Sequence, residues 1–509
     1  MDGSATKPLG VALVLLDRNA PPGVAHGAAH LAQWIADDPR VELVSVDRVP
    51  APRVQGVVPR LMRAEARLHR PGAPRPLPSP VGGAPDVVVD LTGAQAFAGQ
   101  TPRFGVWRLS AHAPGAGFAA IASGAGVTEV VLTAERSGQA TPIERAIYGT
   151  KPLAGLNAAF IGEKSVQLVC RALAELNLTG DLPAPDVPNS SLPATARSDV
   201  GSGPESAPER AGLLRYAALV APRLAARFGG KLGRLAGRRR PAFALRICKG
   251  GPLDFDPTRG VTLRPPAGHF WADPFLHVAG GAPYLFYEDY DGSVGRGLLK
   301  VARLDCDRLV ELGSPIASDD HLSYPFVFAA DGEIWMIPET VASRRIEIWR
   351  AVEFPLHWER VGTALDGYAA ADSVVMCHNG AWWLFTNISN DSFGDHCAEL
   401  HLFRADGPDL RRLEPHPLNP VVVDSTRARG AGRVWAEGGR LYRASQNSSH
   451  GVYGWGLNVM EITRLDGTGY AERRAREITP LTVPGLQACH HMDFAQGRVV
   501  IDLRTDDGA

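Results

Sequence analysis

The 509-residue sequence is poor in cysteine and has almost no net charge, and both features narrow what the protein can be. Its six cysteines are scattered without a Cys-x-x-Cys spacing, so neither a zinc site nor a disulfide framework is indicated. The formal net charge of −1 gives no sign of a nucleic-acid partner in the bulk composition. We therefore expect no metal, no other cofactor and no nucleic-acid partner.

The sequence also lacks long apolar runs. Its N-terminus has no basic segment followed by a cleavage site, and the apolar run Val11–Leu16 is too short for the core of a signal peptide or for a membrane span. These absences predict a cytoplasmic protein. Alanine, glycine, arginine and proline are abundant, a composition that favours a bacterial source with a GC-rich genome.

The sequence does contain one phrase that occurs five times. In each copy a short polar or aromatic segment precedes a glycine, and an apolar run follows it. The glycines lie 51, 48, 59 and 58 residues apart, at Gly281, Gly332, Gly380, Gly439 and Gly497. Short aromatic and β-branched runs joined by glycine turns at this period are typical of propeller blades. The sequence therefore predicts a five-bladed all-β propeller over residues 246–509.

Two columns of polar residues emerge when the five copies are aligned on their glycines. Eight residues before the glycine stand Asp273, Tyr324, Asp372, Ala431 and Cys489, the last beside His490. Seven residues after it stand Glu288, Glu339, Asn387, Gln446 and Arg504. Equivalent positions in successive blades face the same way around the axis, so these side chains should converge on a polar ligand site. The alternative is structural: the carboxylates pair with Arg427, Arg433 or Arg504 around the axis.

Aromatic residues accompany these columns, and sugars bind flat apolar faces beside polar groups. Most of the aromatics must form the blade cores, but Tyr324 and Trp455 are flanked by turn residues and are the better candidates for stacking on a sugar. We predict that the ligand is a glycan or a glycolipid. The predicted substrate-binding residues are Glu288, Tyr324, Asn387, Gln446, Arg433, Trp455 and His490.

Residues 1–175 predict an open, mostly parallel α/β sheet. The continuous apolar run Leu9–Leu16 reads as a strand buried on both faces, and it precedes a helix at 25–37 and further strands at 41–46 and 85–91. No Gly-x-Gly-x-x-Gly follows the first strand, so a dinucleotide site is not indicated.

Gly105–Leu109, Gly117-Phe118, Thr128–Leu132 and Gly138 resemble the N-terminal domain of formyltransferases. That family includes methionyl-tRNA and sugar N-formyltransferases, which use a folate formyl donor. The resemblance implies a site of Asn, His and Asp, of which only His112 has a counterpart here. The later Asp-x-Gly turn is replaced by Arg136-Ser-Gly138. We therefore expect a formyltransferase-like fold that has lost its triad; a sugar N-formyltransferase is the alternative.

Residues 176–245 form the predicted connector. Its first part, to about Ser206, is rich in proline, serine and glycine, which is typical of a flexible linker. Residues 209–240 carry apolar residues at near-helical spacing and a basic face that ends in Arg238-Arg-Arg240. Such a helix can lie on an anionic membrane surface as a peripheral contact. The alternative is a bridging helix with a solvated basic face.

The propeller region resembles one particular domain. Trp271-Ala-Asp-Pro-Phe275, His321–Phe328, Ile337-Pro-Glu339 and Pro415–Val421 look like the N-terminal, propeller-type domain of plant glucosamine inositolphosphorylceramide transferases. Bacterial proteins that join a formyltransferase-like domain to this propeller have the same order. More distantly, the region is similar to the five-bladed family 43 glycoside hydrolases.

That distant similarity implies roles for the carboxylates. Asp273 falls on the position of the general base and Asp372 on that of the residue that tunes its pKa. Gly430-Ala-Gly432 stands where the acid is expected, so we assign the acid to Glu339, with Glu288 as the other choice. Inverting hydrolysis needs two carboxyl groups roughly 6.5–9.5 Å apart. The predicted catalytic set is Asp273, Glu339 and Asp372; the alternative is a glycan-binding or scaffold protein without chemistry.

Overall fold

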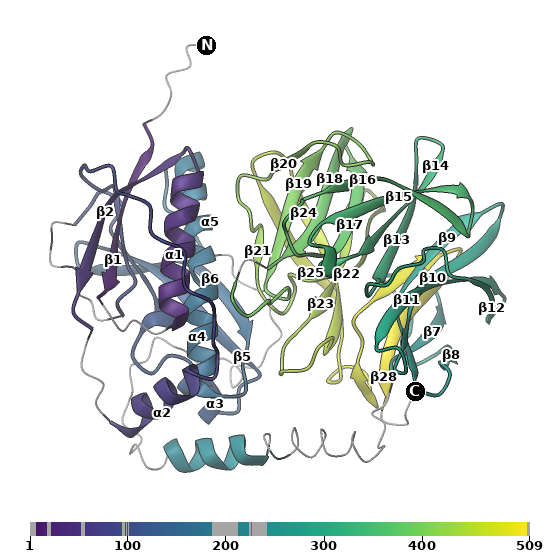
Figure 1. The fold of residues 1–509 in the computed structure, drawn as a ribbon, viewed down its shortest axis with the longest axis horizontal. Helices are drawn as coiled ribbons and strands as arrows, with labels where there is room; N and C mark the ends of the chain where they lie inside the picture. Colours follow the sequence, from purple (N-terminus) through teal and green to yellow (C-terminus); the bar gives the residue numbers. More distant parts are fainter. Residues whose placement is uncertain are drawn as a thin grey trace. The chain divides into compact units, whose positions relative to one another are not determined.

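The computed structural model describes residues 7–17, 22–51, 56–93, 97, 99, 101–185, 212–222, 225, 242–389 and 391–505. The chain forms two compact units. The first comprises residues 1–231 together with 390–395, and the second comprises residues 232–389 with 396–509 (Figure 1).

The first unit is a six-stranded mixed sheet with helices packed against it. The strands are in the order β2-β1-β3-β4-β5-β6. Figure 1 shows α1 beside α4 and α5, the helices that it contacts. The elements are β1 (Leu9–Leu16), α1 (Pro22–Asp37), β2 (Val41–Val49), α2 (Val57–Ala66), β3 (Val87–Asp90), β4 (Val106–Leu109), the 3-10 turn η1 (Ser110–His112), α3 (Phe118–Ala122), β5 (Val127–Arg136), β6 (Gln139–Gly149), α4 (Ala154–Lys164) and α5 (Val166–Thr179).

The sheet is parallel in one half and antiparallel in the other. β1 pairs in parallel with β2 and β3, and its apolar run is buried along nearly its whole length, as the sequence predicts. β5 and β6 instead form an antiparallel hairpin. The turn between them places Ser137 and Gly138 at φ of 52° and 77°, the conformation of a two-residue hairpin loop. The predicted sheet with helices is confirmed in this coarse form; the formyltransferase likeness is not shown and stays a prediction.

Part of the connector is helical. Residues 212–222 form a helix, while 186–211, 223, 224 and 226–241 lie outside the described residues, with most of the predicted basic helix. Tyr216 and Val220 on the described helix are buried, and the Tyr216 hydroxyl donates to Oε1 of Glu65 at 2.6 Å. The Tyr216 ring also stacks on Phe118. This part of the helix therefore uses its apolar face within the first unit.

The second unit is the predicted five-bladed propeller. Blade one contains β9 (His269–Ala279), β10 (Ala282–Asp291), β11 (Arg296–Asp305) and β12 (Arg308–Gly313). Blade two contains β13 (Ser323–Ala330), β14 (Glu333–Glu339), the turn η3 (Val341–Ser343), β15 (Ile346–Glu353) and β16 (His357–Ala364). Blade three contains β17 (Ala370–His378), β18 (Ala381–Ile388), β19 (Glu399–Ala405), β20 (Leu413–Pro415) and β21 (Val422–Val423). Blade four contains β22 (Gly430–Glu437), β23 (Arg440–Asn447), β24 (Gly456–Leu465) and β25 (Tyr470–Ile478).

The fifth blade closes the ring with strands from both ends of the unit. It combines β26 (Leu486–Ala488), β27 (Met492–Ala495) and β28 (Arg498–Thr505) with β7 (Ala244–Lys249) and β8 (Val261–Leu263). β28 pairs with β7 from Arg498 opposite Lys249 to Leu503 opposite Ala244. This pairing closes the ring of blades, and a closed ring leaves few strand edges without a hydrogen-bonded neighbour.

The five glycines of the sequence repeat occupy five equivalent turns. Each is the second of two left-handed residues that join the first two long strands of a blade. The pairs are Gly280-Gly281, Asp331-Gly332, Asn379-Gly380, Gly438-Gly439 and Gln496-Gly497, with φ between 50° and 80° throughout. Two-residue hairpin loops require positive φ at both positions, which favours Asn-Gly, Asp-Gly and Gly-Gly. The repeat therefore records a hairpin in every blade.

Candidate functional site

Three residues of the first polar column share an uncommon backbone conformation. Asp273, Tyr324 and Asp372 have φ of 50°, 48° and 50°, in β9, β13 and β17 respectively. In each blade the pairing with the next strand shifts register at this point. Such bulges bend a strand and redirect a side chain. The column that the glycine alignment reveals is therefore a column of β-bulges.

Asp273 lies beside a buried imidazole. Nε2 of His490 is 3.4 Å from Oδ1 of Asp273, and Nδ1 of His490 is 3.0 Å from Oδ2 of Asp502. Asp502 also accepts three backbone N–H groups, those of Asp273 at 3.2 Å and of His490 and His491 at 2.9 Å each. Asp502 therefore fixes both the backbone of Asp273 and the histidine that contacts its carboxylate.

This arrangement keeps Asp273 ionised. Burial by itself raises the pKa of Asp273, but the hydrogen bond and the charge of His490 outweigh it and hold the pKa below its usual value. Burial likewise lowers the pKa of His490, but Asp502 and Asp273 together raise the pKa to about 10. At neutral pH, His490 is therefore an imidazolium that lies between the carboxylates of Asp273 and Asp502.

A second group of the site is organised by Arg429, just before β22. Its Nε lies 2.6 Å from Oδ2 of Asp372, and one of its terminal nitrogens lies 3.9 Å from Oε2 of Glu339. The backbone N–H of Asp372 donates to the same Glu339 oxygen at 3.2 Å. Gln446 contacts Oδ2 of Asp372 at 3.5 Å and donates to the Gly430 carbonyl at 2.9 Å. The predicted residues Asp372, Glu339 and Gln446 are therefore brought together.

Two carboxyl groups of the site have raised pKa values. Burial raises the pKa of Asp372 to about 7, against the opposing effect of Arg429, and the charges of Glu339 and Asp273 add to the rise. Burial also raises the pKa of Glu288 well above its usual value, with further contributions from Asp273 and Glu339. The site therefore combines an ionised carboxylate, Asp273, with a carboxyl group that burial holds neutral, Glu288, as acid–base chemistry requires.

Several predicted ligand contacts are engaged in the fold instead. The Tyr324 ring is fully buried, and its hydroxyl accepts from the Gly432 N–H at 2.9 Å and donates to the Gly432 carbonyl at 3.2 Å. Trp455 is only 7% exposed and stacks on His450. The expectation that these two rings stack on a sugar stays a prediction, and in this structure both rings are buried.

Asn387 and Arg433 are also structural in their contacts. Asn387 is fully buried, donates to the carbonyls of Glu399 and Ala428, and accepts from the Gly430 N–H. Arg433 pairs with Asp493 and donates to the Leu276 carbonyl at 2.9 Å. The predicted structural pairing of Arg433 around the axis thus occurs, although its acid is Asp493.

Sequence reasoning missed Arg429, His321 and Asp502. Asp502 had a signal: it lies five residues after its glycine, where the other blades carry the apolar residues Phe286, Ile337, Phe385 and Ala444. A charged residue in an apolar column marks a special position. Arg429 and His321 lie just outside the strands, where the alignment on glycines loses its register.

Asp273, His490 and Asp502 also satisfy one requirement of a metal site. One ligand atom from each lies within 4.8 Å of the others. The two carboxylates, however, already raise the pKa of His490 to about 10, so a proton supplies the positive charge between them. A metal would have to displace that proton. The expectation that no metal is needed stays a prediction.

In the first unit, His112 lies in a structural setting. It is buried in η1, and its Nε2 lies 3.0 Å from the Gly162 carbonyl. Burial lowers the pKa of His112. The segment aligned with the formyltransferase Asp-x-Gly is the hairpin turn after Arg136. His112 therefore links η1 to α4, which is a structural role.

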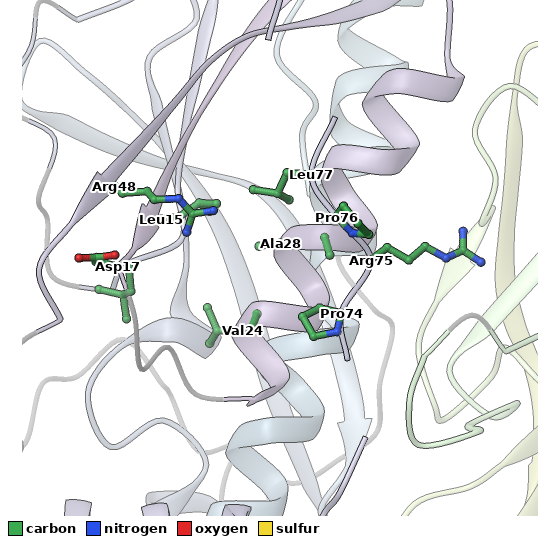
Figure 2. A pocket seen from close by; sticks show the side chains of 12 residues that line it. Leu15, Asp17, Val24, Ala28, Arg48, Pro74, Arg75, Pro76 and Leu77 are labelled. Carbon is green, nitrogen blue, oxygen red and sulfur yellow. The ribbon is translucent and has the colours of Figure 1, made fainter. Parts of the chain in front are cut away.

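The first unit also contains a hollow of about 630 Å³ at the end of β1 and beside the start of α1 (Figure 2). Open α/β sheets often bind ligands at the carboxyl ends of their strands. Asp17, Arg48 and Arg75 are the charged residues among those that line it, and all three are exposed. Figure 2 shows the Arg75 side chain pointing away from the other lining residues. The charged side chains that line the hollow therefore do not point toward one common position. The cluster of carboxylates in the propeller is the stronger candidate for a functional site.

Comparison with known proteins finds similarity in the propeller. Residues 261–481 match the family model described as glucosamine inositolphosphorylceramide transferase 1, N-terminal. The glucosamine inositolphosphorylceramide transferase 1 of Oryza sativa subsp. japonica is 36% identical over 208 residues, which cover 40% of this chain and 28% of the relative. The protein of the same name from Arabidopsis thaliana is 33% identical over 208 residues, or 27% of its length. The chain thus spans little more than a quarter of these relatives.

Solved structures also match part of this chain, at low sequence identity. An exo-β-1,3-galactanase of Clostridium thermocellum is 14% identical, with a TM-score of 0.34, and the match covers 50% of this chain and 57% of that one. The catalytic domain of a family 62 α-L-arabinofuranosidase of Coprinopsis cinerea is 11% identical, with a TM-score of 0.36, and the match covers 52% and 98%.

The relatives correct two expectations drawn from composition. The expected bacterial source is contradicted, because the curated relatives are plant proteins. The expected cytoplasmic setting is contradicted as well, because the relatives are named for inositolphosphorylceramide, a membrane lipid. Among the residues that the structure describes, no helix is long and apolar enough to cross a membrane. The family model and the plant relatives support a carbohydrate-related function, and over residues 261–481 the propeller is similar to the N-terminal domain of glucosamine inositolphosphorylceramide transferase 1.

Proposed function

We propose that the propeller binds the sugar portion of a glycan or glycolipid and hydrolyses or transfers it by acid–base chemistry. The observation that supports this is the contrast within one cluster: the pKa of Asp273 is lowered by its contacts with His490, whereas burial raises the pKa of Glu288 and of Asp372. Glycosidic bond cleavage uses such a pair, one carboxylate and one carboxylic acid. The relatives' name fits a glycolipid ligand, but their transfer activity belongs to proteins of which this chain covers 28%.

Asp273 is the proposed base, because its charge is maintained by His490 and Asp502. Glu288 is the better supported acid. Its Oε1 has no hydrogen-bond partner among the described residues, whereas Oδ2 of Asp372 is held by Arg429. Glu339, the acid assigned from the sequence, accepts a hydrogen bond from the backbone N–H of Asp372. The experiment below therefore also includes a Glu339 variant. Asp372 and Arg429 then contribute to the electrostatic potential around the proposed base, Asp273, and the proposed acid, Glu288.

A second candidate is glycan binding without chemistry. Arg429 contacts both Asp372 and Glu339, and such a buried ion cluster serves the architecture of a propeller equally well. In this version the carboxylates accept hydrogen bonds from sugar hydroxyls and no bond is broken.

The deciding experiment is a screen of glycans and glycolipids against the full chain, with binding and turnover measured in parallel. Asp273→Asn, Glu288→Gln and Glu339→Gln are compared with Glu353→Gln, whose side chain is 79% exposed. We expect turnover that Asp273→Asn and Glu288→Gln abolish while binding survives. Saturable binding without turnover in every form supports the binding module. If no saccharide binds at all, both versions are wrong.

A further inference from the structure

His321 reaches the buried carboxyl group of Glu288 from outside the strands. It lies just before β13, and its Nε2 is 3.5 Å from Oε1 of Glu288. That oxygen is buried and makes no hydrogen bond to any residue that the structure describes. The His321 side chain is 45% exposed and that of Glu288 only 6%. The imidazole therefore stands between solvent and an otherwise unpartnered carboxyl oxygen.

The protonation of the His321 ring is fixed by a backbone contact. The N–H of Gly297 donates to Nδ1 of His321 at 2.8 Å. A neutral imidazole has one N–H donor and one acceptor, so the ring proton must reside on Nε2. Burial lowers the pKa of His321, which keeps the ring neutral. Nε2 therefore carries the proton, and it lies 3.5 Å from Oε1 of Glu288.

Gly297 allows these groups to approach one another. A Cβ atom at this position would clash with Oε1 of Glu288 and would lie 2.7 Å from Cε1 of His321. The Gly297 carbonyl also accepts the N–H of Leu322 at 3.1 Å, so this glycine contacts both the ring of His321 and the backbone of the next residue. Only glycine leaves room for the arrangement.

The other charged groups around Glu288 lie on several elements. Asp273 on β9 and Glu339 on β14 favour its neutral form, as does Asp502 on β28. His490 acts in the opposite direction. A neutral carboxyl group has one acceptor oxygen and one hydroxyl. If a donor makes a hydrogen bond to Oε1 of neutral Glu288, Oε1 is the acceptor oxygen and the carboxyl proton therefore lies on Oε2.

We propose that His321 is a positioning residue for Glu288: its Nε2–H, 3.5 Å from Oε1 in this structure, donates to that oxygen once a sugar occupies the site and so places the acidic proton on Oε2, the atom that donates to the leaving oxygen of the sugar. This rests on the proposed function. In turnover the Oε2–H bond breaks and a bond from the proton to the leaving oxygen forms. The glycosidic bond electrons stay with that oxygen, and the oxygen of a water or acceptor hydroxyl, which gives its proton to Asp273, bonds to the anomeric carbon. Glu288 becomes a carboxylate that still accepts from His321, and water returns its proton.

The arrangement can be tested without a substrate. Imidazole nitrogen NMR on the histidine-labelled full chain reports the tautomer of each ring, and loss of one signal in His321→Gln identifies His321. We expect the Nε2–H tautomer with Nδ1 as an acceptor. Gly297→Ala should shift this signal, whereas Gly467→Ala, where a Cβ meets nothing within 4 Å, should not. A Nδ1–H tautomer would overturn the proposal.

A kinetic arm uses any glycan that the screen identifies. His321→Ala should lower kcat on the order of tenfold to a hundredfold with little change in KM, as misplacement of a catalytic group does. The alkaline limb of the pH–rate profile should move up, because a lost hydrogen bond to the carboxylate raises the pKa of Glu288. His321→Gln, which keeps an N–H donor, should recover part of the rate. If Glu288→Gln abolishes turnover and His321→Ala does not slow it, this inference fails while the proposed function stands. If no glycan is turned over, the function fails and NMR alone decides the positioning.

Discussion

Asp273 and Asp372 adopt the same left-handed backbone conformation, with φ of 50° in each, at equivalent positions of the first and third blades. Such a conformation costs a non-glycine residue on the order of 1–3 kcal/mol and persists where the surroundings enforce it. The charge of Asp273 contributes to the raised pKa of Asp372, so the two bulges direct their carboxyl groups into one cluster. The strained backbone of Asp273 and Asp372 thus accompanies the convergence of their carboxyl groups, and the proposed chemistry needs carboxyl groups close together.

The ion pair between Arg429 and Asp372 should be important for stability. Arg429→Met leaves the buried Asp372 and the partly buried Glu339 without their cation, and breaking a buried pair costs about 3–5 kcal/mol. We expect a matching fall in the urea midpoint of the propeller transition. The double variant Arg429→Met/Asp372→Asn should recover part of it, because the uncompensated charge is gone. Arg350→Met is the control, since its pair with Glu359 is exposed and is worth less than about 1 kcal/mol. Equal losses in Arg429→Met and Arg350→Met would contradict the prediction.

The Tyr324 hydroxyl should stabilise the propeller through its contacts with Gly432. Tyr324→Phe leaves the buried N–H and carbonyl of Gly432 without their partner, which costs about 1–3 kcal/mol. Tyr368→Phe is the matched control, because that residue is 48% exposed and the change should stay within about 0.5 kcal/mol. Thermal unfolding of both variants measures the difference. A loss of glycan affinity with unchanged stability would instead make Tyr324 a ligand contact.

The first unit should not transfer formyl groups. The Nε2 of His112 is engaged by the Gly162 carbonyl, and the sequence offers neither the asparagine nor the aspartate of the family site. We expect no formylated amino sugar when the full chain is incubated with a folate formyl donor, as measured by mass spectrometry. Formylation that His112→Asn abolishes would make the protein a sugar N-formyltransferase.

The sequence predicts the hairpins well because their requirement is local. A two-residue loop needs positive φ, and Asp331-Gly332 or Asn379-Gly380 states this directly in the residue types. Aligning the glycines therefore places Asp273, Tyr324 and Asp372 in one column from the amino-acid sequence alone. The closure of the ring is different: β7 joins β28 from about 250 residues away, and no local pattern records that pairing.

The partners of the predicted residues were harder to foresee than the residues themselves. Arg429 and His321 lie outside the repeating strands, so their place beside Asp372 and Glu288 depends on how loops return to the axis. The burial of the aromatic residues was hard to foresee for another reason. A flanking turn suggests exposure, but Tyr324 sits on a bulge that turns its ring inward, and Trp455 is covered by His450.

The pH dependence of stability should depend on His490. Its pKa is raised to about 10 in the folded protein against an ordinary value of 6.5, so the folded form binds the proton more tightly than the unfolded form. This contribution is complete below about pH 6.5 and is lost as the pH rises towards 10. We expect the urea midpoint of the propeller transition to fall across that window. His490→Gln should be less stable by about 3–5 kcal/mol at pH 6, because it breaks a buried pair.

The slope distinguishes this effect from general alkaline unfolding. Tyrosine, lysine and cysteine groups titrate in both proteins, so the difference between wild type and His490→Gln isolates the histidine. That difference should shrink steadily from pH 6.5 to pH 10. His357→Gln is the control, because the His357 side chain is 70% exposed and its removal should leave the profile unchanged. A difference that stays constant with pH would mean that His490 is neutral in the fold. The contacts with Asp273 and Asp502 would then be ordinary hydrogen bonds, and the ionised state of the proposed base would need another cause.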